Sequence, residues 1–309
     1  MNFFKTLFLF SPLFAAAQVD IQAANKCRET NYQFFRQGQQ EQQSSKIYDK
    51  KGNLLSQIDT FSSRNTGDYT NEYTYEYDAN GNNSQIVYKL NGQIKKVTKK
   101  SYNGLGKLLS ESISADGKVS PLSLLTTNDG EKTQVFYAQD GTTELSKEKS
   151  LFNKAGQLVK KELSSANGIL MMSEIKSYDL QGNITQNTHF DAADQVTLST
   201  NYEYDAKGNL LNDKTFRNNI ILAETKNEYD LAGKLIKKTR LNAQNQVDYH
   251  FTYEYDLLGN MIKENYFYNN QVMSIRTFEY DTNGNKIKES YLDRTGNISM
   301  YKVWAFDCK

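Results

Sequence analysis

The sequence is poor in the residues that build most catalytic and metal sites. It contains two histidines, His189 and His250, and two cysteines, Cys27 and Cys308. Neither histidine has a second histidine or a cysteine at metal-ligand spacing. The sequence also lacks a G-x-S-x-G nucleophile elbow, a Walker-type phosphate loop and a G-x-G-x-x-G motif opening a helix. It therefore predicts a non-enzymatic protein with no cofactor and no metal.

Proline, net charge and long apolar runs are also scarce. The only prolines are Pro12 and Pro121, which suits long uninterrupted sheet, because an internal proline removes a donor from the strand ladder. The 37 Lys and Arg residues balance 36 Asp and Glu residues, so there is no electrostatic reason to expect nucleic acid as a partner. No stretch after residue 17 is apolar enough to span a bilayer as a helix, so no transmembrane span is expected.

Residues 1–17 have the pattern of a secretory signal. Lys5 is the positive flank, Leu7 to Phe14 is a short apolar run, and Ala15 to Ala17 offer a small-residue cleavage site. The apolar run is too short for a stable transmembrane span. We therefore expect an exported protein that is secreted, periplasmic or at the cell surface, with an N-terminal segment at 18–30 before the main domain.

Aromatic residues, in contrast, are abundant, with 21 Tyr and 16 Phe, and this argues against disorder. They recur in one motif, Tyr-Glu-Tyr-Asp-x-x-Gly-Asn, seen at 253–260 with copies at 75–82, 202–209 and, beginning with Phe, 278–285. The alternation of Tyr and Glu predicts a half-buried strand. Asp-x-x-Gly predicts a type I turn with a left-handed glycine. Each copy therefore predicts a β-hairpin.

The aromatic residue before the turn recurs at a nearly fixed period. The intervals are 26, 26, 25, 26 and 25 residues for Phe152, Tyr178, Tyr204, Tyr229, Tyr255 and Tyr280. A second turn signal, such as Asn91-Gly92 or Asn218-Asn219, lies midway in each unit. Such a period indicates a repeat architecture. We predict an all-β, antiparallel hairpin meander of about 22 short strands, forming a twisted or spiral sheet in one array over residues 31–307.

The middle of the array has the weakest pattern. Around Thr127 the aromatic residue is missing, and Pro121 lies just upstream. This predicts a bend or an irregular strand at about 119–131. Simple drift of one repeat is the alternative explanation.

Two motif copies, 78–82 and 281–285, resemble the start of a calcium loop. An EF-hand has glycine at the sixth position and glutamate at the twelfth. Here glycine is at the fourth position, and the twelfth residues are Lys89 and Leu292. We interpret both segments as turns in which Asp accepts backbone hydrogen bonds.

Two further patterns follow the turns. Apolar pairs such as Leu210-Leu211 and Leu235-Ile236 predict that the sheet curls so that parts of both faces are covered. The Lys and Glu residues after these pairs, such as Lys263-Glu264, are expected to form cross-strand ion pairs on a solvated face.

The two cysteines flank the array. In an exported protein, Cys27 and Cys308 suggest a disulfide. Bridged Cα atoms must lie within about 7 Å, and an open array would hold its ends much farther apart. An intrachain bridge would therefore mean that the array closes or coils back. Free terminal thiols and an intermolecular bond are the alternatives.

The repeated motif resembles YD repeats, the unit of RHS-type and teneurin-like proteins, over roughly residues 31–307. The resemblance implies hairpins that wind into a long spiral sheet or a shell, on secreted or cell-surface proteins that include toxin carriers and adhesion or carbohydrate-binding proteins. The sequence departs from the family in its longer period and in lacking the Pro-Asp-Pro-x-Gly type core signature and a C-terminal effector domain. A stand-alone repeat array without a toxin is therefore expected.

Binding of an extracellular glycan or protein partner is the leading functional hypothesis. Tyr75, Tyr202, Tyr253 and Phe278 recur at one strand position and are candidate rings for stacking on sugars; the alternative is that they only form the core. A structural scaffold of the envelope and a part of an RHS-type toxin delivery system are alternative functions. A glycan hydrolase is least favoured, because a catalytic carboxylate pair should be unique and these carboxylates recur.

Overall fold

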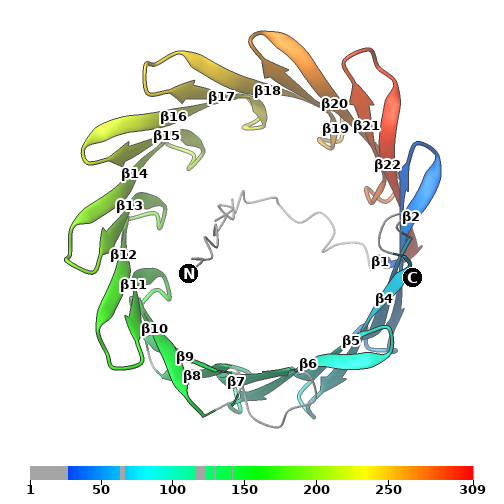
Figure 1. Ribbon diagram of the computed structural model, residues 1–309. Helices are drawn as coiled ribbons and strands as arrows, with labels where there is room; N and C mark the ends of the chain where they lie inside the picture. The colour runs from blue at the N-terminus through cyan, green and yellow to red at the C-terminus, as the bar shows by residue number, and fades with distance from the viewer. Residues whose placement is uncertain are drawn as a thin grey trace.

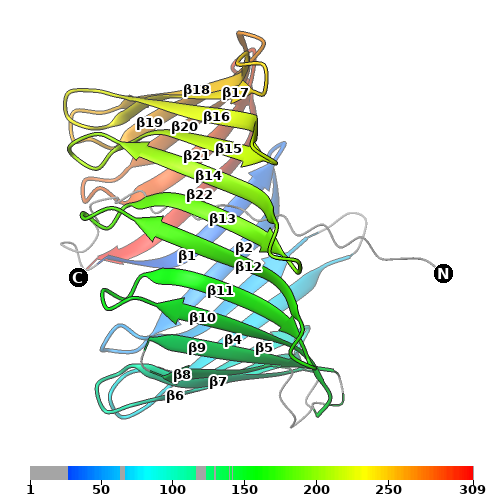
Figure 2. The same ribbon diagram turned by 90° about the vertical axis from the view of Figure 1, so that its left-hand side faces the viewer.

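The protein is a single sheet that closes on itself. The computed structural model describes residues 27–62, 67–115, 123–128, 130–138, 140 and 142–308. Every regular element in these ranges is a strand, and each strand pairs antiparallel with its neighbours in the chain. The first strand also pairs with the last, which closes the 22-stranded sheet into a barrel (Figure 1). The strands run obliquely around it (Figure 2). Closure leaves no free sheet edge to pair with another chain.

The strands follow one another without any intervening helix in the described ranges. In chain order they are β1 (Cys27–Arg36), β2 (Gln39–Tyr48), β3 (Leu54–Phe61), β4 (Tyr69–Tyr77), β5 (Asn83–Leu90), β6 (Gln93–Tyr102), β7 (Leu108–Ala115), β8 (Ser123–Asn128), β9 (Glu131–Tyr137), β10 (Glu144–Phe152), β11 (Leu158–Ser165), β12 (Leu170–Tyr178), β13 (Ile184–Asp191), β14 (Val196–Tyr204), β15 (Leu210–Arg217), β16 (Ile220–Tyr229), β17 (Leu235–Asn242), β18 (Val247–Tyr255), β19 (Met261–Tyr268), β20 (Gln271–Tyr280), β21 (Lys286–Asp293) and β22 (Ile298–Cys308).

The predicted all-β meander and its strand number are confirmed, while closure was left open by the sequence. β1 begins at Cys27, so residues 27–30 of the predicted N-terminal segment belong to this strand, and residues 27–29 pair with the end of β22. The predicted signal at 1–17 and residues 18–26 lie outside the described residues. β8, in the segment predicted to be irregular, is the shortest strand with 6 residues. Residues 116–122 and 129 are outside the description, so the bend there stays a prediction.

The turns have the predicted geometry. The Asp256 amide donates to the Asn260 carbonyl at 2.9 Å, the Gly259 amide donates to the Asp256 carbonyl at 3.0 Å, and Gly259 has a φ of 93°. The Asp256 carboxylate accepts bonds from the backbone amide and the side-chain amide of Asn260. The segments 78–82 and 281–285 repeat this arrangement. The carboxylates of these two segments therefore accept hydrogen bonds within their own turns.

A β-bulge follows most of these turns. Tyr255 faces Met261, but Glu254 faces Lys263, so Ile262 is an extra residue in β19. Five such extra residues are aliphatic and between 37% and 40% exposed, namely Leu55, Leu109, Leu211, Ile236 and Ile262. A bulge bends its strand and increases local twist, so repeated bulges help to curve the sheet. The sheet curls as predicted, but the second residue of these apolar pairs remains substantially exposed.

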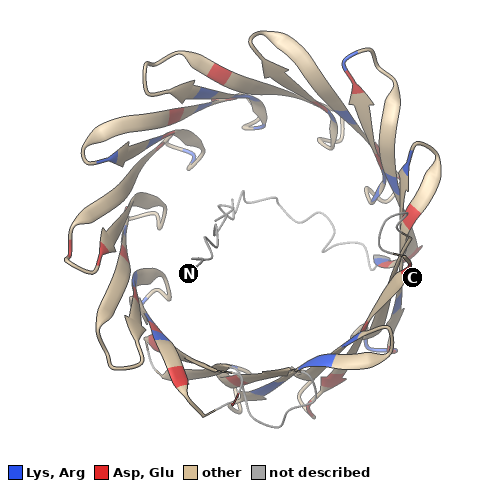
Figure 3. Cartoon of the chain, viewed as in Figure 1, with Lys and Arg blue, Asp and Glu red and all other residues tan. Residues whose placement is uncertain are grey.

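The sheet has one layer and hardly any apolar core. Ala223 and Leu241 are the buried apolar residues of the described chain. Cross-strand ion pairs form after the turns as predicted, for example Lys263 with Glu254 at 3.0 Å. Residues of both charge signs are dispersed around the barrel (Figure 3). Stability therefore comes from the strand ladder and from cross-strand pairs. No helix able to cross a membrane occurs among the described residues.

Candidate functional site

The second tyrosine of each repeated motif is a structural anchor. The Tyr255 hydroxyl donates a hydrogen bond to the Leu235 carbonyl at 2.8 Å. Leu235 lies next to the extra residue Ile236, where the bulge disrupts the ladder. Equivalent bonds to a backbone carbonyl are made by Tyr48, Tyr77, Tyr102, Tyr178, Tyr204, Tyr229 and Tyr280. Burial raises the pKa of Tyr255. These hydroxyls tie neighbouring repeats together at the bulges.

The four predicted binding rings occupy the first aromatic position of the motif, and the structure brings two of them together. Tyr253 in β18 and Phe278 in β20 are separated by one strand, which corresponds to roughly 10 Å. Tyr202 is in β14 and Tyr75 is in β4, at other places around the barrel. All four rings are half-buried. Tyr253 and Phe278 therefore define the candidate site.

Three of the four rings lie opposite a carboxylate on the next strand. The register pairs Tyr253 with Glu264, Phe278 with Glu289, and Tyr202 with Asp213. Tyr75 differs, because its partner is Ile86. We call the sheet surface that carries Tyr253, Glu264, Arg276, Phe278 and Glu289 the Tyr253 face. On this face an aromatic ring and an acid alternate from strand to strand.

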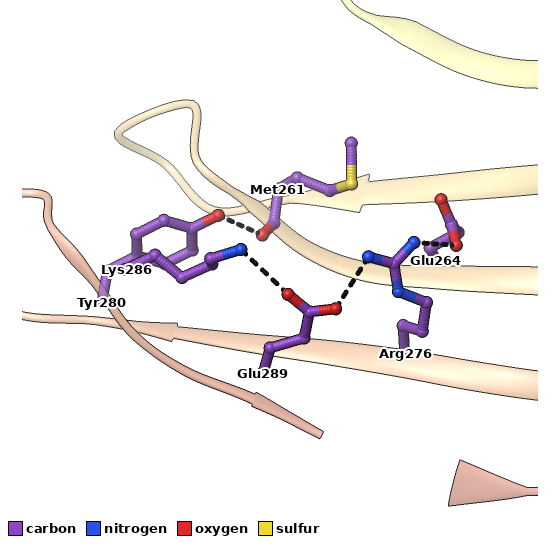
Figure 4. A network of polar contacts seen from close by, with 6 residues as sticks. All are labelled: Met261, Glu264, Arg276, Tyr280, Lys286 and Glu289. Carbon is purple, nitrogen blue, oxygen red and sulfur yellow. Dashed lines mark hydrogen bonds and ion pairs between the residues drawn. The ribbon is translucent and has the colours of Figure 1, made fainter. Parts of the chain in front are cut away.

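An ion-pair network connects these acids. One guanidinium nitrogen of Arg276 lies 2.9 Å from Glu264 and the other lies 2.8 Å from Glu289. Lys286 contacts the second Glu289 oxygen at 2.9 Å. Figure 4 shows these contacts beside the hydrogen bond from Tyr280 to Met261. We call Glu264, Arg276, Lys286 and Glu289 the Arg276 cluster. Its two acids and two bases balance in charge.

Glu289 is the buried centre of the Arg276 cluster, being 3% exposed. Burial by itself raises the pKa of its carboxyl, but hydrogen bonds from Tyr291, Lys286 and Arg276 outweigh burial and hold the pKa at about 2. Glu289 is therefore ionised at neutral pH. The side chains of Arg276 and Lys286 are each 36% exposed, so Glu289 orients two cations that reach the surface.

Aromatic rings surround these cations. The Arg276 guanidinium lies 5.3 Å from the ring centroids of Phe278 and Tyr291. The Lys286 ammonium lies 4.6 Å from the ring of Trp304 and 5.6 Å from that of Phe278. Cations at such distances are attracted to the ring faces. The sole tryptophan of the chain thus joins the same site as Phe278.

A second polar group surrounds the carboxylate opposite Tyr202. Asp213 is 8% exposed, and Arg240 lies 3.7 Å from it while donating to the Thr225 hydroxyl at 2.9 Å. Burial raises the pKa of Asp213 despite these favourable neighbours. Burial also lowers the pKa of Lys238. The group has fewer nearby rings than the Arg276 cluster, so it is the weaker candidate.

A shallow cavity of about 310 Å³ lies where β1 meets the end of β22. Its lining includes Arg28, Lys46, Tyr48 and Asp307. Lys46 is paired with Glu29 at 2.6 Å, and Arg28 donates to the Asp49 carbonyl at 3.4 Å. The cavity contains none of the predicted binding rings. Within the described ranges, no group of three or more His, Cys, Asp or Glu residues is placed to hold a metal ion.

Tyr253 and Phe278 are predicted from the sequence, whereas Arg276, Glu289 and Trp304 are not. A signal for the acids was present, because Asp213, Glu264 and Glu289 each follow their aromatic partner by 11 residues. Combined with the hairpin register, that spacing places ring and acid side by side. No equivalent spacing pointed to Trp304, which reaches the site through packing of β22 against β21.

Comparison with known proteins gives distant structural likenesses only. No family model matches the chain, and no curated protein matches it significantly. A TcdB2-TccC3-Cdc42 crystal structure is similar at 15% identity and a TM-score of 0.32, over 84% of this chain and 19% of that one. A porin-like protein from Bacteroides uniformis is similar at 8% identity and a TM-score of 0.36, over 90% and 98% of the two chains. A porin-like protein from Bacteroides vulgatus has 11% identity and a TM-score of 0.26, over 81% and 97%. At these TM-scores the likenesses carry no argument about family or function.

Proposed function

We propose that the protein is an exported, non-enzymatic YD-repeat protein that binds an uncharged glycan on the Tyr253 face between β18 and β22. One observation supports this site above the others: the Phe278 ring lies beside both Arg276 and Lys286, whose side chains are each 36% exposed, and the Trp304 ring lies beside Lys286. Export is supported by the signal pattern of residues 1–17, and the YD assignment is supported by the repeated motif.

Sugars need both apolar and polar contacts. An aromatic ring offers a flat apolar surface on which the C–H groups of a pyranose can stack. Arg276 and Lys286 can donate hydrogen bonds to hydroxyl oxygens, and Glu264 can accept from hydroxyl groups. Glu289 holds both cations in place from beneath the surface. The Tyr253 face therefore combines stacking with oriented donors and acceptors.

The charge balance of the Arg276 cluster favours an uncharged ligand. Both cations are already paired with carboxylates at 2.8 to 2.9 Å. An anionic group would have to displace a carboxylate from its cation, and this would leave that carboxylate half-buried and unpaired. A neutral hydroxyl group can add to the remaining donors without breaking an ion pair. We therefore expect neutral glycans to bind better than sulfated or sialylated ones.

A glycan array with the mature protein, followed by calorimetry on each hit, tests the proposal. Phe278→Ala and Trp304→Ala are expected to weaken binding by about fivefold to 150-fold each, if a sugar ring stacked on an aromatic side chain contributes about the 1–3 kcal/mol that a stacked nucleobase does. Tyr268→Ala is the matched control, since Tyr268 is a 44% exposed ring at the C-terminal end of β19, four residues after Glu264. Circular dichroism establishes that the variants are folded.

Two results would contradict the proposal. One is the absence of any neutral glycan ligand, which would favour the scaffold alternative. The other is a ligand whose affinity falls equally with Tyr268→Ala and Phe278→Ala, because binding would then not be centred on the Arg276 cluster.

A further inference from the structure

The seam, where β1 pairs with β22, differs from the other strand junctions because no turn of the chain connects its two strands. Of the 22 neighbouring strand pairs in the closed sheet, 21 are consecutive in the chain, and the seam alone joins the first strand to the last. Hydrogen-bonded pairing and packing hold it together. Phe35 stacks on Tyr301 with ring centroids 4.6 Å apart, and Tyr32 packs on Trp304 at 5.5 Å.

The seam nevertheless reproduces the register of a turn-joined pair. Glu29 faces Phe306 and Asn31 faces Ala305, so Thr30 is an extra residue in β1. This matches β18 and β19, where Ile262 is the extra residue one position after the partner of Tyr255. The anchor is also present, because the Tyr48 hydroxyl donates to the Glu29 carbonyl at 3.0 Å. The two chain ends therefore meet as the two halves of an interrupted hairpin.

The cysteines occupy the place of the missing turn. Asp307 faces Arg28 as Asp256 faces Asn260 in an intact turn. One step further, Cys308 and Cys27 face each other, at the positions that Leu257 and Gly259 hold in that turn. The chain has only these two cysteines. Both thus lie at the one strand junction that lacks a connecting peptide.

We propose that Cys27 and Cys308 form a disulfide that closes the barrel covalently in place of this turn. Directly opposed residues of an antiparallel pair have Cα atoms about 4.5–5.5 Å apart. That spacing lies inside the range of about 4.4–6.8 Å over which disulfides form. The bond also closes a loop that contains the whole array, and constraining a long loop restricts the unfolded chain most.

The oxidation requires an external disulfide, for which glutathione disulfide is a suitable reagent. The Cys27 thiol loses its proton, and the thiolate attacks one sulfur of glutathione disulfide and releases one glutathione thiolate. The deprotonated Cys308 sulfur then attacks the Cys27 sulfur of this mixed disulfide and releases the second glutathione. One disulfide forms, one is broken, and two protein protons pass to the two glutathione thiolates.

Mass spectrometry of the mature protein tests the pairing directly. The protein is incubated with glutathione disulfide at low concentration and then alkylated with iodoacetamide without a reductant. We expect no alkylated cysteine, a mass lower by two hydrogens than that of the reduced protein, and a proteolytic peptide linking Cys27 to Cys308. Two alkylated thiols, stable glutathione adducts or a disulfide-linked dimer would each overturn the proposal.

Stability measurements test the role in closure. Dithiothreitol is expected to lower the unfolding midpoint of the oxidised protein, while a Cys27→Ser, Cys308→Ser double variant should unfold at the reduced midpoint with or without the reductant. An equal midpoint for the oxidised and reduced proteins would refute covalent closure as a stabilising feature. If the double variant does not fold, the oxidised and reduced forms of the unmodified chain still provide this comparison.

Discussion

Removing one tyrosine hydroxyl tests the repeated anchor most sharply. Tyr255→Phe deletes the donor of the 2.8 Å bond to the Leu235 carbonyl and keeps the ring. The carbonyl belongs to a residue at a bulge, where the ladder is interrupted. We expect a loss of about 1 kcal/mol in the free energy of unfolding, since a net hydrogen bond contributes about 0.5–1.5 kcal/mol and the carbonyl loses its partner in a half-buried place.

Urea denaturation followed by circular dichroism measures this loss. For a protein of this size, about 1 kcal/mol corresponds to a drop of roughly 2 °C in the thermal midpoint. Tyr204 makes the same bond to Ile184 at 3.0 Å and lies four strands from Tyr255. The Tyr204→Phe and Tyr255→Phe losses should therefore add to within about 0.5 kcal/mol.

The matched control is Tyr268→Phe, at a ring that is 44% exposed. Its free energy of unfolding should stay within about 0.5 kcal/mol of the unsubstituted protein. The anchoring role of the hydroxyl is refuted if Tyr255→Phe has as little effect as Tyr268→Phe while Tyr255→Ala is strongly destabilising. That result would mean that the ring alone, and not its hydroxyl, connects the repeats.

Three further substitutions probe the Arg276 cluster, the turns and the solvated face. The pKa of Glu289, lowered to about 2, implies a stabilisation of the folded state that is complete above pH about 4.5 and is lost as the pH falls towards 2. Glu289→Gln should therefore lower the free energy of unfolding by on the order of 3 kcal/mol at pH 7. Denaturation at a series of pH values should show this difference between the two proteins shrinking on acidification. Gly259→Ala places a Cβ on a residue with a φ of 93° and should lower the free energy of unfolding by about 1–2 kcal/mol, measured in a thermal melt. Gly104→Ala, where open space surrounds the new Cβ, should change it by no more than about 0.5 kcal/mol. Equal effects of the two substitutions would contradict the turn geometry. Lys263→Ala removes an ion pair whose side chains are 36% and 52% exposed, so it should change the free energy of unfolding by less than about 1 kcal/mol, and a larger loss in high salt would contradict a screened surface pair.

Local chemistry explains why so much of the fold could be predicted. Asp256 and Gly259 specify their turn within five residues, because the carboxylate accepts local amide bonds and glycine tolerates a positive φ. The nearly constant interval between Tyr229, Tyr255 and Tyr280 then counts the hairpins. The pairing of Tyr255 with Met261 next to the turn could also be predicted. The register shift at Ile262 could not, because the alternation of side chains in the sequence fits a regular strand as well as a bulged one.

Only part of the candidate site could be predicted from the sequence, because the other residues meet through contacts between different strands. Tyr253 and Phe278 share a motif position, and the hairpin register alone brings them within one strand of each other. Trp304 is in no repeated motif, and its approach to Lys286 depends on how β21 and β22 pack next to the seam. The role of Arg276 depends on simultaneous contact with Glu264 and Glu289 from two different strands.

By itself, the sequence determined the turns, the number of strands and the meander, because each of these depends on contacts between residues close in the chain. Only the tertiary structure decided that the sheet closes. Closure depends on twist and curvature summed over 22 strands, and a small change in each would leave the ends apart. The same summed geometry places Cys27 opposite Cys308.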